Sequence, residues 1–260
     1  MSDVAIALGL TLLAGLSTAI GGLLALFIKK PGQYFLPLTL GFSGGVMIYI
    51  SFVEMFPLAM KTVSEELAVL SFFLGMGFIA MIDLAIPQKE NPHNFSNANL
   101  NPKTQKSDNA KKMLIRTGYF TALAIGIHNF PEGMATFATA LTDVNLGIVI
   151  ALAIALHNIP EGLAVYVPIF YATGSKKTAF KYTFLSGLAE PVGAVIAYLV
   201  LMPFLNDALL AMMLTFVAGI MVYISIDEII PAAHSYGKSH VVIVGVVFGM
   251  LMMAASLLML

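Results

Sequence analysis

Two copies of one short motif carry the residues whose types and spacing suggest chemistry. Residues 123–135 read L-A-I-G-I-H-N-F-P-E-G-M-A and residues 152–164 read L-A-I-A-L-H-N-I-P-E-G-L-A, identical at nine of 13 positions with an offset of 29. Each copy places a histidine, an asparagine and a glutamate inside a long apolar run. Because polar and ionisable side chains are costly in such a run, they indicate a functional site.

The spacing within H-N-x-P-E places all three polar side chains on one side of a helix. His and Glu are four residues apart, and Asn and Glu are three apart, so they share a helix face. The six side chains are His128, Asn129, Glu132, His157, Asn158 and Glu161. The proline of each copy also disturbs the carbonyl four residues back, at Ile127 and at Leu156, which could then turn toward a cation.

A third contribution comes from Glu190, in S-G-L-A-E-P. Three carboxylates offset the charge of one or two divalent cations in a low dielectric, whereas a lone buried glutamate is expected to protonate. The chain has no cysteine, so disulfides and thiolate metal sites are excluded. The remaining N and O ligands suit borderline to hard divalent cations. The alternative, a hydrogen-bonded polar knot that only joins helices, explains one motif better than two motifs plus Glu190.

Composition places these residues in a membrane. Of the 260 residues, 59% are hydrophobic and 10% are charged, against about 25% charged in soluble domains. The apolar runs predict an all-α integral membrane protein with a single domain, 1–260, in the cell membrane. Eight transmembrane helices, numbered as spans 1 to 8, are expected at 4–28, 36–60, 67–87, 115–140, 146–171, 178–202, 209–233 and 240–260. No basic patch lies outside the loops, so nucleic acid is not an expected partner.

The connection 88–113 is rich in Asn, Lys, Pro and Ser and predicts a flexible, solvated loop between spans 3 and 4. Except for Lys61, all 13 Lys and Arg residues fall in connections 1–2, 3–4, 5–6 and 7–8. The positive-inside rule makes these connections cytoplasmic and places the N- and C-termini outside.

Weaker repeats extend through the chain. Residues 45–57 match 219–231 at seven of 13 positions with an offset of 174, and 13–25 match 185–197 at five of 13 with an offset of 172. Spans 3 and 8 share a Gly-Met pair, again at offset 174. The pairs 1/6, 2/7, 3/8 and 4/5 each join an odd span to an even one, so the partners run antiparallel. This predicts a 3+2+3 inverted-repeat bundle, an architecture of transporters with a central site. Chance similarity explains the 1/6 and 3/8 matches equally well, but not the other two.

Three further acids lie nearer the span ends. Glu54 falls toward the outer end of span 2, and Asp227 and Glu228 fall toward the inner end of span 7. Acids at opposite mouths of a repeat pair could be places where metal enters and leaves. Solvated carboxylates at the membrane interface account for them equally well, so their role stays open.

The doubled H-N-x-P-E-G motif and the eight-span pattern resemble the ZIP (Zrt/Irt-like) family of metal transporters, and within it the bacterial ZupT-like branch. The resemblance covers essentially the whole chain. It implies a binuclear centre at His128, Asn129, Glu132, Asn158, Glu161 and Glu190, with His157 as a further participant. It also implies a homodimer, and a movement of spans 1, 4, 5 and 6 against spans 2, 3, 7 and 8.

The expected function is therefore uptake of divalent cations by alternating access. Zn²⁺ is expected first, and Fe²⁺, Mn²⁺, Co²⁺ and Cd²⁺ also fit as substrates, with no resident cofactor. An intramembrane metal-dependent hydrolase is the alternative, because the same ligands could activate water. The chain lacks H-E-x-x-H, however, and inverted repeats favour transport. A passive channel is a third possibility.

Overall fold

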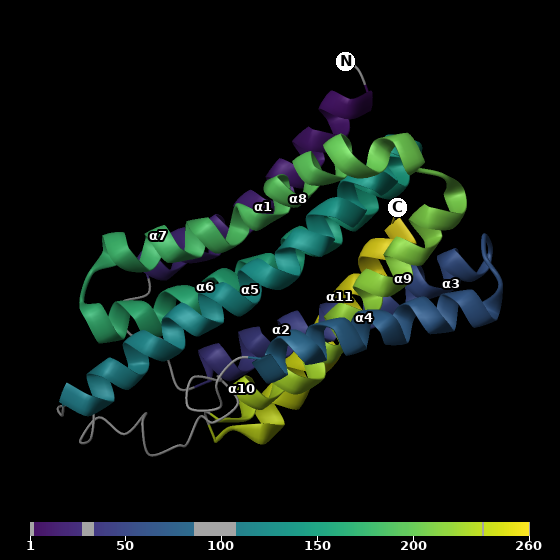
Figure 1. The fold of residues 1–260 in the computed structure, drawn as a ribbon. Helices are drawn as coiled ribbons and strands as arrows, with labels where there is room; N and C mark the ends of the chain where they lie inside the picture. The colour runs from purple at the N-terminus through teal and green to yellow at the C-terminus, as the bar shows by residue number, and fades with distance from the viewer. Residues whose placement is uncertain (1–2, 28–33, 86–107, 236, 260) are drawn as a thin grey trace.

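The computed structural model describes residues 3–27, 34–85, 108–235 and 237–259, and within them it contains helices and no strands (Figure 1). The α-helices are α1 (Asp3–Phe27), α2 (Phe35–Ile50), α3 (Phe56–Met60), α4 (Glu65–Ala85), α5 (Asp108–Thr142), α6 (Val144–Thr173), α7 (Lys176–Gly187), α8 (Ala189–Ile196), α9 (Asp207–Ile224), α10 (Ile230–Ser235) and α11 (Ser239–Met259). Short π-helical segments join some of them: η1 (Ser51–Met55), η4 (Ala197–Leu201) and η6 (Ser225–Ile229).

These helices confirm the predicted membrane protein. Within the described residues, seven helical stretches are long and apolar enough to cross a membrane. The 35-residue α5 lies against α6 and carries the first motif. Predicted and observed span limits mostly agree within two residues, but α5 begins at Asp108 instead of 115, inside the predicted loop 88–113. Residues 108–114 include Ala, Lys, Met and Leu, which are good helix formers, so the helix extends beyond its apolar part. Residues 88–107 of that loop lie outside the described residues.

A tight turn makes α5 and α6 an antiparallel pair. Asp143 alone separates them, and its side-chain oxygen accepts hydrogen bonds from the backbone N–H of Asn145, at 2.9 Å, and of Leu146, at 3.1 Å. This is an N-terminal cap of the favoured residue type. Both helices continue through the motif prolines without a break. The two H-N-x-P-E copies therefore face each other from oppositely directed helices.

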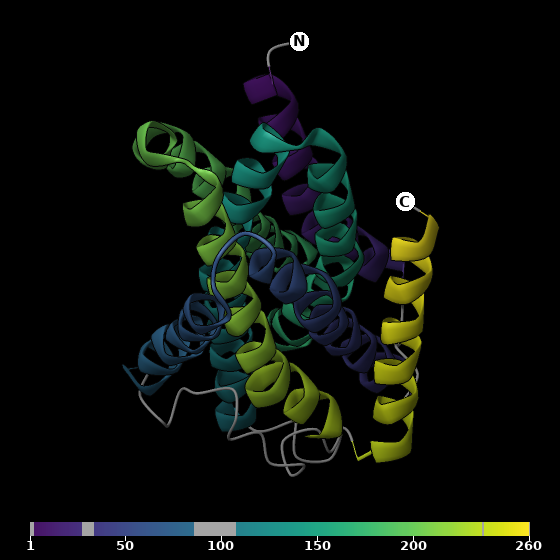
Figure 2. The ribbon, with the colours of Figure 1, turned by 90° about the vertical axis from the view of Figure 1, so that its right-hand side faces the viewer.

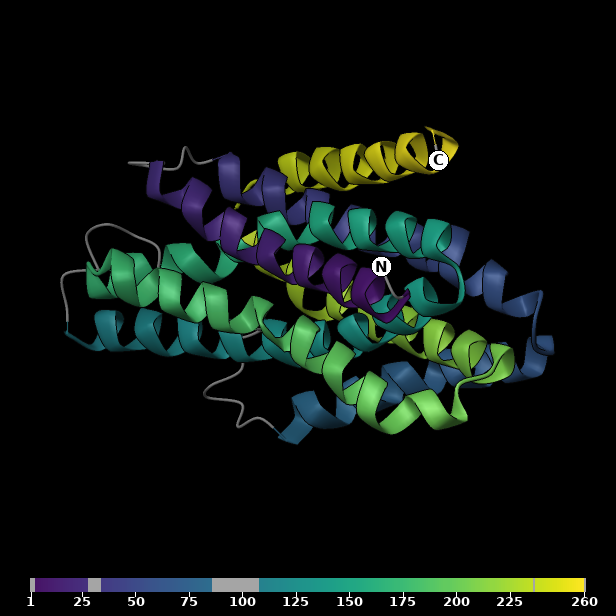
Figure 3. The ribbon, with the colours of Figure 1, turned by 90° about the horizontal axis from the view of Figure 1, so that it is seen from above.

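The helices form two groups (Figures 1 and 3). The motif bundle comprises α1, α5, α6, α7 and α8, in which α1 packs on α6 and α8 packs on α5. The flanking bundle comprises α2, α3, α4, α9, α10 and α11, in which α11 packs on α2 and α4 packs on α9. Figure 2 shows α11 at one edge of the molecule. Contacts between the bundles run mainly from α2 to α6 and from α5 to α9.

Glycines allow the close approaches inside each bundle, and they do so in matching pairs. A methyl group at Gly75 would overlap the carbonyl oxygen of Phe216, and one at Gly249 would overlap the carbonyl oxygen of Phe42. Both residues of the first contact are related to the second by the offset of 174 found in the sequence. Small residues at such positions are typical of helix packing in membranes.

The same correspondence holds in the motif bundle. A methyl group at Gly21 would overlap the carbonyl oxygen of Ile159, and one at Gly193 would overlap that of Phe130. Gly21 and Gly193 are 172 residues apart, and Phe130 and Ile159 are 29 apart. The π-helical segments η1 and η6 also begin 174 residues apart. The contacts thus follow the residue pairs that the sequence repeats predict.

Two neighbouring glycines of α4 provide a test of this packing. We expect Gly75→Ala to lower the unfolding temperature of the detergent-solubilised protein, because overpacking against Phe216 costs about 1–3 kcal/mol. Gly77 has no neighbouring atom within 4 Å of an added Cβ. Gly77→Ala is therefore the matched control, and it should leave the melting temperature unchanged or raise it. Equal melting temperatures for the two variants would contradict close packing of α4 on α9.

Candidate metal centre

All seven predicted ligands come together inside the motif bundle. The α5 and α6 motifs face each other, and the first turn of α8 joins them. Every one of the seven side chains is 0% exposed: His128, Asn129, Glu132, His157, Asn158, Glu161 and Glu190. The prediction that these residues lie on the apolar spans is confirmed, and their shared burial gives the candidate centre its defining property.

Each histidine faces the glutamate of the other helix. His128 Nε2 lies 3.1 Å from Glu161 Oε2, and His157 Nε2 lies 3.5 Å from Glu132 Oε2. The first pair has hydrogen-bonding geometry, whereas the second is close enough for an ion pair but lacks a hydrogen bond. The arrangement is crosswise, so neither motif copy completes its own contacts. A carboxylate and an imidazole thus meet twice at the α5–α6 contact.

The two asparagines are held by their amide nitrogens. Asn129 Nδ2 donates to the carbonyl oxygen of Ser186 at 3.2 Å, and Asn158 Nδ2 donates to that of Ala14 at 3.2 Å. The acceptors are 172 residues apart, so the two bonds are repeat equivalents. Because the nitrogens point at backbone carbonyls, the amide oxygens remain to face a cation.

Glu190 breaks this symmetry. Asn158 Nδ2 also donates to Glu190 Oε1, and the repeat equivalent of Glu190 is Thr18. Gly133 lies against the Glu190 carbonyl, and Gly162 lies against the Thr18 carbonyl. The same close approach therefore delivers a carboxylate from α8 and a hydroxyl from α1.

Buried polar atoms without partners show what the cluster suits. Such atoms are rare in folded proteins, because leaving them unpaired is costly. Among the described residues of the centre, those without a hydrogen-bond partner are His128 Nδ1, Asn129 Oδ1, both Glu132 oxygens, both His157 nitrogens, Asn158 Oδ1 and Glu190 Oε2. Imidazole nitrogens and carboxylate or amide oxygens are ligands for divalent transition metals.

The ligand atoms do not form a completed metal polyhedron. Within the part of the chain that the structure describes, no three His, Asp or Glu residues are arranged to hold an ion together. The histidine and glutamate side chains instead contact one another across the helix pair. Small rotations of these side chains would exchange His–Glu contacts for contacts to a cation, and the free asparagine oxygens need no such change.

Ser43 of α2 is a site residue that the sequence did not reveal. Its hydroxyl, fully buried, lies 3.3 Å from the carbonyl oxygen of His157 and 3.5 Å from Glu161 Oε1, to both of which it can donate. Its repeat equivalent is Val217, so no polar pair marks it. Ser43 is a contact to the centre from the flanking bundle, and only the packing of α2 on α6 identifies it.

The three other acids are not brought into the centre. Glu54 lies in η1, and Asp227 and Glu228 lie in η6; all three are half-buried. Glu228 is close enough to act electrostatically on His128. Glu54 and Glu228 are repeat equivalents, and each occupies a π-helical segment, a deviation frequent at functional sites. Their role stays open.

Comparison with known proteins agrees with this geometry. The sequence profile described as "ZIP Zinc transporter" matches residues 85–257. The chain belongs to the ZIP family of zinc transporters. It is similar to "Zinc transporter ZupT" of Clostridium perfringens, with 50% identity over 100% of this chain and 97% of that protein. It is 53% identical to "Zinc transporter ZupT" of Streptococcus mutans, over 96% of each chain, and 53% identical to that of Chlorobium limicola, over 100% of each.

Membership of the ZIP family decides between the classes of function. Its members are transporters and not enzymes, so the intramembrane hydrolase is set aside. Together with the membrane-spanning helices, it makes the chain a multi-pass protein of the cell membrane.

Ser43 can be tested against Ser51, a second buried serine of the same span. The Ser51 hydroxyl donates only within its own helix, to Met47 O at 2.7 Å. We expect Ser43→Ala to weaken zinc binding about 10-fold, because residues that orient ligands tune metal affinity. The measurement is the rise in melting temperature of the purified protein with added zinc. Ser51→Ala should keep the wild-type response; an equal loss in both variants would argue against a role for Ser43 at the centre.

Proposed function

We propose that this ZIP transporter carries divalent cations into the cell, with zinc as its main substrate. The observation that carries the proposal is the fully buried cluster of unpartnered imidazole, carboxylate and amide atoms at the α5–α6 contact. The relatives named as zinc transporters support the choice of zinc. Iron, manganese, cobalt and cadmium are also substrates, because a centre of N and O ligands without thiolates discriminates weakly among these metals.

The centre binds two ions in this proposal. Glu132 and Glu161 each face a histidine of the opposite helix, a position from which a carboxylate can bridge neighbouring ions. Asn129 and Asn158 supply amide oxygens, and Glu190 supplies a further carboxylate. Three carboxylates close together in a dry interior are stabilised by divalent cations, since like charges at that distance otherwise disfavour ionisation.

Transport proceeds by alternating access in a 3+2+3 inverted repeat. The matching contacts at offsets of 29, 172 and 174 support this architecture. The motif bundle moves against the flanking bundle, and Ser43 lies where they meet. Complete burial of the ligands favours a carrier over a passive channel, because a channel requires a continuous open path.

Orientation and assembly complete the proposal. The distribution of Lys and Arg places both termini outside and the loop 88–113 in the cytoplasm. The chain forms one transmembrane domain over residues 1–260 and functions as a homodimer in the lipid bilayer. None of its loops forms a nucleic-acid-binding surface.

Zinc uptake by carboxylate variants tests the centre. In proteoliposomes, Glu132→Gln and Glu161→Gln should each lower saturable zinc uptake at least about 10-fold, because each removes a charged ligand without changing side-chain size. Thr215→Val is the control: Thr215 is also 0% exposed, but its hydroxyl bonds only within α9. It should transport like the wild type.

Two outcomes would contradict the proposal. Wild-type zinc uptake in either glutamine variant would remove that carboxylate from the transport path. Flux that does not saturate with zinc concentration in the wild-type protein would favour a channel over a carrier.

A further inference from the structure

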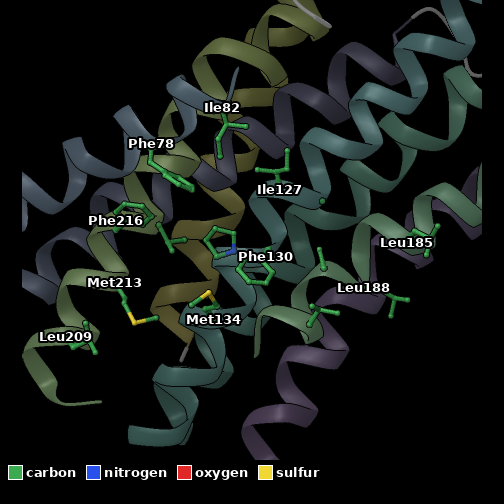
Figure 4. A pocket seen from close by; sticks show the side chains of 15 residues that line it. Phe78, Ile82, Ile127, Phe130, Met134, Leu185, Leu188, Leu209, Met213 and Phe216 are labelled. Carbon is green, nitrogen blue, oxygen red and sulfur yellow. The ribbon is translucent and has the colours of Figure 1, made fainter. Parts of the chain in front are cut away.

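A large apolar pocket lies between the two bundles, on the side of α5 away from the metal centre. Its volume is about 820 Å³, within the range of pockets that hold small molecules. Figure 4 shows Phe130 and Met134 of α5 between Met213 and Phe216 of α9 on one side and Leu188 on the other. The lining residues are Phe78, Ile82, Gly126, Ile127, Phe130, Pro131, Met134, Leu185, Leu188, Ala189, Val192, Leu209, Met213, Phe216 and Val217, all of them apolar.

The pocket opens sideways near the middle of the membrane spans. Leu185 and Val192 lie midway along the span Lys176–Val200 and are 48% and 52% exposed. At the floor, Val217 lines the pocket although it is only 3% exposed. The surroundings at that depth are the hydrocarbon tails of the bilayer, since the chain is a multi-pass membrane protein. A pocket without polar side chains gives water no partners and suits apolar guests.

The equivalent place in the other half of the repeat is closed. Offsets of 174 and 29 pair Val217 and Pro131, which line the pocket, with Ser43 and Pro160. There α2 packs against α6, Ser43 reaches the Glu161 carboxylate, and Pro160 is buried. Around Val217 and Pro131, α9 and α5 make sparser contact and leave the pocket between them. The two halves therefore differ in whether the bundles touch.

We propose that this pocket binds the hydrocarbon tail of a membrane phospholipid. The tail enters between Leu185 and Phe78, which are exposed on the two sides of the opening, and reaches Val217. Its headgroup stays outside, because no lining side chain is polar or charged. Binding requires no transfer from water, since the tails already surround the protein, so favourable dispersion contacts with the aromatic and Met side chains are what retain it.

A bound tail has a consequence for movement, which rests on the proposed alternating access. It fills the space that α5 and α9 would occupy if they packed as α6 and α2 do. The tail thus stabilises the arrangement in which α2 contacts α6 and the other side of the bundle contact is open. Because α5 also carries Asn129 and Glu132, the pocket lies one helix away from the metal centre.

Photolabelling tests the tail site without any transport assay. The full-length protein is placed in liposomes of phosphatidylglycerol with a trace of phosphatidylcholine that carries a diazirine within one acyl chain. After illumination, we expect label at Val217 severalfold above label at Val222, a valine of the same helix that is also 3% exposed but does not line the pocket. Equal label at the two valines overturns the proposal, whether or not the protein transports zinc.

Two pocket-filling variants, Val192→Trp and Met213→Trp, make the test independent of one substitution. Each correctly folded variant, identified by a single size-exclusion peak, should lose the label at Val217. Leu251→Trp, at a 62% exposed position of α11 outside the pocket, should retain it. Unchanged label in both pocket variants also overturns the proposal. Loss of the wild-type Val217 label together with cross-links from Leu185 to another copy would assign the pocket to a second copy of the chain instead.

Discussion

The paired contact between imidazole and carboxylate across α5 and α6 is the interaction on which the rest of this structure depends. Carboxylates at the depth of a bilayer core are expensive unless they are paired or hydrogen-bonded. His128 with Glu161 and His157 with Glu132 provide that pairing only if two antiparallel helices bring the motifs to the same level. The single-residue turn at Asp143 and the close approaches at Gly133 and Gly162 are the structural requirements that this contact imposes.

The inverted correspondence of contacts explains why so many features occur twice. Asparagine to carbonyl, glycine to carbonyl and π-helical segment all recur at the sequence offsets. Two substitutions within this pattern carry its asymmetry: Glu190 where the other half has Thr18, and Ser43 where the other half has Val217. The first adds a charge to one side of the metal centre, and the second adds a hydrogen bond from the flanking bundle.

The boundary between the bundles has a different character on its two sides. Between α2 and α6 it is closed and includes the polar contact of Ser43, whereas between α5 and α9 it holds an apolar pocket. A transporter whose halves exchange conformations requires such a difference, because only one side of an internally symmetric structure can be open at a time. Metal binding and the surrounding lipid thus act on opposite faces of the same helix, α5.

Much of this protein was determined by its sequence alone. Apolar runs of about 20 residues are constrained by bilayer thickness, so seven of the eight spans were placed within about two residues, and the exception, α5, begins earlier because its first residues favour a helix in solvent. The doubled motif predicted the seven ligands because ionisable side chains in an apolar run are too costly to be there without a role. Only the tertiary structure decided the partners: that each histidine faces the glutamate of the other helix, that Ser43 reaches Glu161, and that one bundle contact is open. These features depend on the relative position of helices far apart in the chain, and a residue such as Ser43, without a polar repeat partner, carries no local signal of what it will contact.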